Sequence, residues 1–153
     1  MTKPFATLVT FIALFFLTDK INSQETTKSN QKLHNTLVDS YYNLNVKAFQ
    51  KNSKVEDIDR IFNLFTDDFV YVHPKYGGTY TRENLYKGYI RNKKNGMYDG
   101  TITGIKIFNR IAGLNALVVK RIYIDKDTKE EKDAKMTLFE FKEGKISKIF
   151  EYW

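Results

Sequence analysis

The sequence predicts an α+β domain in which helices come first and a mainly antiparallel sheet follows. Two observations lead to this fold class. In the first half, apolar residues recur at steps of three and four, the spacing of helices with one buried face. In the second half, apolar and β-branched segments are separated by short polar or glycine-containing links. With 153 residues in all, the chain has room for one such domain.

The first residues predict an export signal rather than part of the domain. Lys3 supplies a positive start, and residues 6–17 form a continuous apolar run. A run of about 7–15 residues is typical of a signal peptide and is shorter than the ~20 residues that cross a bilayer. We therefore predict a signal peptide over 1–23, a flexible tether over 24–32 and the domain over 33–153. The mature protein is then periplasmic or secreted, without membrane contact; a retained anchor is the alternative.

Two helices are expected at the start of the domain. The first has one wide apolar stripe, formed by Leu33, Leu37, Tyr41, Leu44 and Ala48. The second is expected to begin at Ser53, because Ser53 and Glu56 have the spacing of a capping box. Its predicted buried face consists of Val55, Ile58, Ile61, Phe62 and Phe65.

The remaining elements follow in order. Residues 69–73 are β-branched and aromatic, so they predict a strand that Pro74 ends. A turn over 75–78 leads to Thr81, which we expect to cap a third helix that ends near Gly96. Further strands are predicted over 98–108, 116–124, 134–141 and 145–152, the last two joined by a tight hairpin at Glu143 and Gly144.

Charge and composition exclude several classes of function. The formal net charge is +7, but most lysines stand beside acidic residues, which favours a solvated surface over a nucleic-acid site. The chain has no cysteine, so disulfides and thiolate metal sites are excluded, and two histidines make a zinc site improbable. Glycine-rich phosphate loops and the usual hydrolase motifs are missing from the sequence. We therefore predict no cofactor and no metal, although carboxylates alone remain an open alternative for a metal.

Three segments in this order and spacing carry a family resemblance: residues 64–74, 77–85 and 138–153, the last ending in a Tyr-Trp pair. Together they resemble the nuclear transport factor 2-like superfamily, including its SnoaL-like and ketosteroid-isomerase-like branches, in an exported bacterial form. The resemblance implies a cone-shaped roll in which three helices pack on a curved sheet and enclose a pocket. It also implies that a homodimer through the sheet face is possible. The superfamily hosts several activities, so the fold leaves the function open.

The resemblance also indicates where a site would lie. His73 matches the position at which ketosteroid isomerases keep an aspartate general base, and a neutral imidazole there can accept a proton. Met136 matches the position of their protonated aspartate, and a methionine cannot donate the hydrogen bond needed there. Their tyrosine donor has no clear counterpart in Tyr41 or Tyr42. Steroid isomerisation by that mechanism is therefore not expected.

Period-two alternation groups the candidate residues by face. His73 falls with Phe69 and Tyr71, while Glu151 falls with Trp153. In the superfamily the first and last strands lie close together, so Glu151 or Glu140 could orient His73. We predict His73 and Glu151 as catalytic candidates, and as ligand-binding candidates Tyr42, Phe69, Tyr71, Met136, Leu138, Glu140 and Trp153.

Simpler roles compete with these assignments. His73 could be a hydrogen-bonded turn residue, and Glu151 could be an exposed charge at the rim. One residue of the pair Lys120 and Arg121 must point inward, to meet an anionic ligand or to pair with an acid.

Three functions remain open. The first is an exported domain that binds a small, partly apolar molecule. The second is a cofactor-independent isomerase, dehydratase or cyclase with His73 as general base. The third is a dimerising interaction domain. A carboxylate within hydrogen-bond reach of His73 would favour the second over the first.

Overall fold

The computed structural model describes residues 28–129 and 133–153. Within it, Leu33–Trp153 forms one compact unit. The predicted signal peptide, 1–23, lies outside the described residues. Residues 28–48 form the first helix, so the segment 28–32, which the sequence assigned to a tether, is helical. Two more helices follow, α2 (Val55–Phe62) and α3 (Arg82–Lys94).

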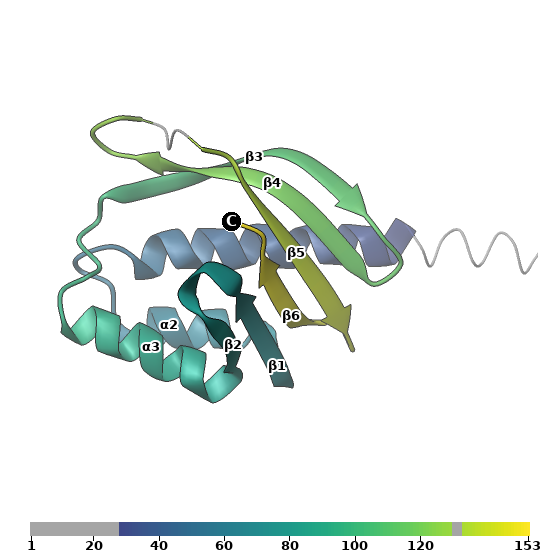
Figure 1. The fold of residues 1–153 in the computed structure, drawn as a ribbon, viewed down its shortest axis with the longest axis horizontal. Helices are drawn as coiled ribbons and strands as arrows, with labels where there is room; N and C mark the ends of the chain where they lie inside the picture. The colour runs from purple at the N-terminus through teal and green to yellow at the C-terminus, as the bar shows by residue number, and fades with distance from the viewer. Residues whose placement is uncertain (1–27, 130–132) are drawn as a thin grey trace, which may run out of the picture. The chain divides into compact units, whose positions relative to one another are not determined.

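A six-stranded sheet forms the other layer (Figure 1). Its strands are β1 (Phe65–His73), β2 (Gly78–Thr81), β3 (Ile102–Ala112), β4 (Ala116–Asp125), β5 (Lys135–Lys142) and β6 (Lys145–Glu151). They lie in the order β2-β1-β6-β5-β4-β3, and only the β1–β6 pair is parallel. The register shifts in β1, β3 and the β5–β6 pair, and such bulges bend a sheet. The predicted class, helices on a curved and mainly antiparallel α+β sheet, is confirmed.

The core lies between the helices and the inner face of the sheet. Phe139 of β5 is fully buried, with its ring centroid 5.5 Å from that of Tyr41 and 5.7 Å from that of Tyr42 on the first helix. Phe65 and Phe69 of β1 stack at 3.9 Å. Alternate residues of the central strands therefore point toward the helices, as period-two geometry requires.

The start of α2 differs from the prediction. Lys54 is the capping residue, and its backbone N–H donates to the Asp57 carboxylate at 2.9 Å. The predicted box at Ser53 and Glu56 is one residue out of register. Val55, expected on the buried face, is the first residue of α2, and 43% of its surface is exposed. Phe65, expected on this helix, is instead the first residue of β1.

Near the pocket, the structure differs from the prediction at two further points. Residues Pro74–Tyr76 form a short 3-10 helix, and β2, which the sequence analysis missed, then pairs with β1. Strand β3 begins at Ile102, four residues later than expected. The predicted cap of α3 is confirmed, since the Thr81 hydroxyl accepts from the Asn84 backbone N–H at 3.2 Å. The β5–β6 hairpin is confirmed too, with φ of 54° at Glu143 and 72° at Gly144.

Candidate functional site: a tyrosine-lined pocket

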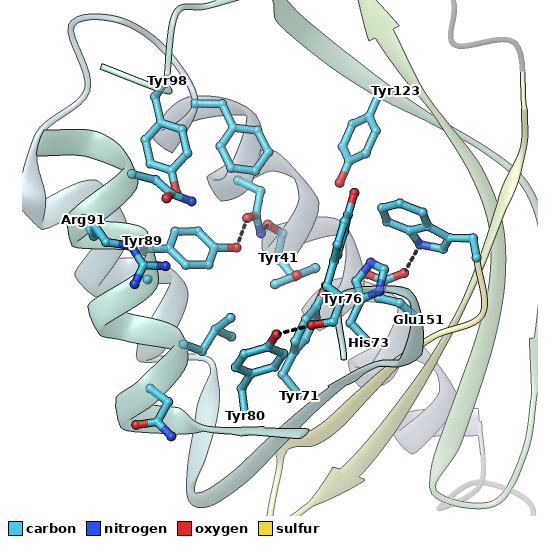
Figure 2. A pocket seen from close by; sticks show the side chains of 17 residues that line it. Tyr41, Tyr71, His73, Tyr76, Tyr80, Tyr89, Arg91, Tyr98, Tyr123 and Glu151 are labelled. Carbon is cyan, nitrogen blue, oxygen red and sulfur yellow. Dashed lines mark hydrogen bonds between the residues drawn. The ribbon is translucent and has the colours of Figure 1, made fainter. Parts of the chain in front are cut away.

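A cavity of about 500 Å³ lies between the first helix, α3 and the ends of β1, β4 and β6 (Figure 2). This volume is within the usual range for small-molecule sites. Most of its wall is aromatic, and seven of the lining residues are tyrosines: Tyr41, Tyr71, Tyr76, Tyr80, Tyr89, Tyr98 and Tyr123. The pocket thus combines flat apolar surfaces with phenol hydroxyls.

His73 closes β1 and lines this pocket. Its side chain is only 2% exposed, and its ring lies 4.3 Å from the Tyr76 ring and 4.5 Å from the Trp153 ring. Neither imidazole nitrogen has a hydrogen-bond partner among the described residues. Burial lowers the pKa of His73 below its usual 6.5, and the negative charge of Glu151 opposes that shift. The imidazole is therefore neutral at pH 7, with one donor and one acceptor unused.

Glu151 lies at the same end of the pocket and is 2% exposed. Its Oε2 accepts from the Thr137 hydroxyl at 2.7 Å and from the Trp153 indole N–H at 2.6 Å. Nη2 of Arg121 lies 3.4 Å from Oε1. With these three partners the carboxylate is occupied, and none of its hydrogen bonds goes to His73. In the described part of the chain, therefore, no carboxylate is hydrogen-bonded to His73 to orient it as a base.

Arg121 of β4 is the inward residue of the Lys120–Arg121 pair. It is 1% exposed; its Nε donates to the Tyr42 hydroxyl at 3.0 Å, and its guanidinium lies 4.4 Å from the centre of the Tyr123 ring. Arg121 does not line the pocket, so its positive charge stabilises the Glu151 carboxylate from outside the cavity. Of the two roles left open for an inward cation, pairing with an acid is the one observed.

Three of the pocket tyrosines, Tyr71, Tyr89 and Tyr98, keep their protons at neutral pH. Burial raises the pKa of Tyr71 and Tyr89 well above 10 and that of Tyr98 to about 12. Tyr89 donates to the Asn45 side-chain oxygen at 2.5 Å, and Tyr80 donates to the Tyr76 carbonyl at 2.9 Å. These rings are held in place by the protein itself.

Several pocket tyrosines were not predicted as site residues. Tyr76 lies in the 3-10 helix, where the sequence indicated only a turn, and Tyr80 lies in β2, which was missed. Tyr89 lies on α3, which was predicted only as a helix. Their shared signal is composition: the chain has 10 tyrosines. Composition cannot say which of them meet in space.

The structure separates the predicted ligand-binding residues into three groups. Tyr71 and Trp153 line the pocket with His73 and Glu151. Tyr42 and Phe69 are buried in the core between the helices and the sheet, and they do not line the pocket. Met136, Leu138 and Glu140 require a correction, because they do not line the pocket at all.

The register of β5 explains this correction. Thr137 pairs with Glu151 and Phe139 pairs with Ile149, which places Thr137 and Phe139 on the inner face. Met136 and its period-two neighbours must then face outward. There Met136 lines a second hollow of about 340 Å³, and the Glu140 carboxylate lies 3.8 Å from the Lys148 ammonium.

The described residues contain no group of three or more metal-ligand side chains that could hold a metal ion. In the same part of the chain, no helix is both long enough and apolar enough to cross a membrane.

No family model matches the sequence, and no curated protein matches it either. Solved structures do match. An NTF2-like protein of unknown function from Burkholderia xenovorans has a TM-score of 0.55 at 15% identity, over 80% of this chain and 84% of that one. This chain has the nuclear transport factor 2-like fold.

Two further neighbours carry names that suggest activities. A putative ketosteroid isomerase from Kribbella flavida matches with a TM-score of 0.53 and 12% identity, over 80% of this chain and 78% of that one. A putative polyketide cyclase from Sinorhizobium meliloti matches with a TM-score of 0.52 and 13% identity, over 76% of this chain and 93% of that one. At these identities the likeness shows the nuclear transport factor 2-like fold alone.

Proposed function

We propose that this domain binds a small, partly apolar molecule in the tyrosine-lined pocket, with a polar group of that molecule hydrogen-bonded to His73. The observation that carries the proposal is a buried imidazole that faces a cavity with both nitrogens unpaired among the described residues. Leaving a buried polar group without a partner costs about 1–3 kcal/mol. A ligand hydroxyl or carbonyl at His73 would recover that free energy.

Matched naphthalene probes test this proposal. We expect 2-naphthol to bind about tenfold more tightly than naphthalene, because only the hydroxyl can pair with the imidazole. Probe fluorescence and calorimetry measure the two affinities. In His73→Phe the preference for the hydroxyl should disappear, while the aromatic contacts with Tyr76 and Trp153 stay.

His34→Phe is the matched control for this experiment. His34 stacks on Phe141 at 3.9 Å and does not line the pocket, so this variant should keep the preference for 2-naphthol. Failure of both probes to bind, or an unchanged preference in His73→Phe, would contradict the proposal.

Catalysis by His73 is the second candidate, and the neutral state of the imidazole favours it, since that form accepts a proton. The occupied Glu151 argues against it, because no carboxylate orients the ring. Proton exchange at the activated carbon of 2-tetralone in D₂O tests the idea. Exchange that is faster with the wild type than with His73→Phe would establish catalysis, and equal rates would leave binding alone.

A homodimer through the outer face of the sheet is the third candidate. Ile111 and Met136 expose 64% and 43% of their surface there, around the second hollow. Charged substitution at Met136 should then shift the mass in sedimentation toward the monomer. The same change at Met97, which is exposed but lines neither cavity, should have no effect.

Export is also proposed, on the apolar run over residues 6–17. Intact mass of the protein from its native host tests it, since a mature chain that retains this run would contradict export.

A further inference from the structure

We infer that the ligand carries an acidic group, and that this anion lies at Arg91 while the ring system occupies the aromatic pocket. The inference rests on the proposed function and names the chemical class of the molecule: a small aromatic or polycyclic acid. It follows from the charges that line the cavity and from the partners each of them has.

The pocket has no negative charge available for a cationic ligand. Among the side chains of the described residues, Glu151 is the only carboxylate that lines it, and Thr137, Trp153 and Arg121 already surround that group. Burial also raises the pKa of Tyr41, Tyr71 and Tyr89 well above 10, so these hydroxyls carry no negative charge at neutral pH. A ligand ammonium would therefore lose its hydration with only aromatic faces and phenol oxygens in exchange, and without a free side-chain carboxylate.

Arg91 is the positive charge that lines the pocket. The other arginines of the described chain each have a polar partner: Arg60 with Asp57, Arg82 with the Phe62 carbonyl, Arg110 with Asp39 and Arg121 with Glu151. Among the described residues Arg91 has no side-chain hydrogen bond or ion pair. Its guanidinium can therefore receive a carboxylate in two parallel hydrogen bonds without first breaking a contact.

The two polar features lie on opposite sides of the cavity. Figure 2 shows Arg91 on α3 at one side, and His73 with Glu151 at the other, with tyrosine rings between them. Further positive charge surrounds the His73 side, since the Lys135 ammonium lies 3.7 Å from the centre of the Trp153 ring and that of Lys75 lies 5.9 Å from it. A flat molecule with an acid at one end and a hydroxyl at the other matches this layout.

A surface role for Arg91 is the competing explanation, because basic residues in the last turn of a helix complement its dipole. Lys94 occupies the same turn and fits that role equally, but it does not line the pocket. The two residues therefore form a matched pair of variants, one inside the proposed site and one outside it.

Four naphthalene probes separate the two ends of the pocket: 2-naphthol, 6-hydroxy-2-naphthoate, its methyl ester, and 2-naphthylmethylammonium. We expect 6-hydroxy-2-naphthoate to bind about fivefold more tightly than the ester, the gain typical of a partly exposed ion pair. The cation should bind most weakly. Calorimetry at low and at high salt should show the preference for the acid shrinking as salt rises, because Arg91 is exposed.

Arg91→Gln should abolish the preference for the acid over the ester, and Lys94→Gln should retain it. Equal binding of acid and ester to the wild type, equal loss in both variants, or tighter binding of the cation would overturn the inference. If 2-naphthol binds without any preference for the acid, only the inference fails. If none of the probes binds, the proposed function fails and the inference with it.

Discussion

The inner face of the sheet has two ends that are equally buried but chemically different. At the core end, Phe69 of β1 and Ile149 of β6 are 1% and 0% exposed. At the pocket end, the same two strands place His73 and Glu151, each 2% exposed. Burial therefore does not distinguish the two ends; what differs is that the pocket end carries polar side chains that line the cavity.

The two pocket-end residues differ from each other in the pairing of their polar atoms. Glu151 is surrounded by donors, whereas neither nitrogen of His73 has a partner among the described residues. The Thr66 hydroxyl and Nη1 of Arg121 are buried without a partner too, but only His73 of these three residues lines the cavity, where a ligand can reach it. Under the proposed function, Glu151 therefore belongs to the structure of the wall and His73 to recognition of the ligand.

The largest expected effect is at the core end. Phe139→Ala should lower the free energy of unfolding by about 3–5 kcal/mol, because a fully buried ring between two tyrosines leaves a cavity. Chemical denaturation measures it. Leu138→Ala, on the outer face of the same strand, is the control and should cost clearly less. Equal losses would contradict the division into inner and outer faces.

A somewhat smaller loss of unfolding free energy is expected at Glu151, in the wall of the pocket. Glu151→Gln should cost about 3 kcal/mol in unfolding free energy, because it leaves the buried Arg121 without a countercharge. The double variant with Arg121→Met and Glu151→Leu should be less destabilised than the single one, since no uncompensated charge remains. A double variant that loses the full sum of the two single effects would show no coupling between the two charges and would contradict this expectation.

At His73, at the pocket end, the effect of substitution on stability should be small or even favourable. His73→Phe should leave the unfolding free energy unchanged or raise it by about 1 kcal/mol, because it removes two unpaired buried nitrogens and keeps an aromatic ring. Denaturation with urea measures this change. A loss as large as that of Phe139→Ala would place His73 in the core rather than in a site.

Local signals in the sequence were sufficient for most of the fold. Apolar spacing located the first helix, Thr81 located the start of α3, and Glu143 with Gly144 located the last hairpin. Each of these depends on a few neighbouring residues, which is why sequence alone reveals them. β2 was missed because its four residues have no apolar pattern of their own and pair only with β1.

The site was less predictable because it depends on long-range register. Alternation grouped His73 with Tyr71, and Glu151 with Trp153, and these four line one pocket. The same alternation could not say which face of β5 points inward, so Met136 was placed in the pocket although it faces away. The partners of Glu151 come from β4, β5 and the end of the chain, which no local pattern reveals.

The smallest expected effect is the dependence of stability on pH. Burial lowers the pKa of both His34 and His73 below 6.5 in the folded protein. Between each lowered pKa and 6.5, the unfolded chain binds more protons than the folded one, so stability rises with pH. The contribution of each histidine is thus fully present above 6.5 and is lost as the pH falls toward its folded pKa. Aspartates such as Asp57, with a pKa lowered from 3.8, lose theirs only at more acid pH.

We therefore expect the unfolding free energy of the wild type to decline as the pH falls from about 7 to about 5, within which the unfolded histidines take up protons. His73→Phe should remove the share of this decline that comes from the pocket, and His34→Phe the share that comes from the first helix. Urea denaturation at a series of pH values measures the slopes. A bound hydroxyl probe should steepen the wild-type slope, because 2-naphthol holds the neutral imidazole, and should leave that of His73→Phe unchanged. A His73→Phe variant with the wild-type slope, with and without probe, would show that the imidazole does not titrate in the pocket as described.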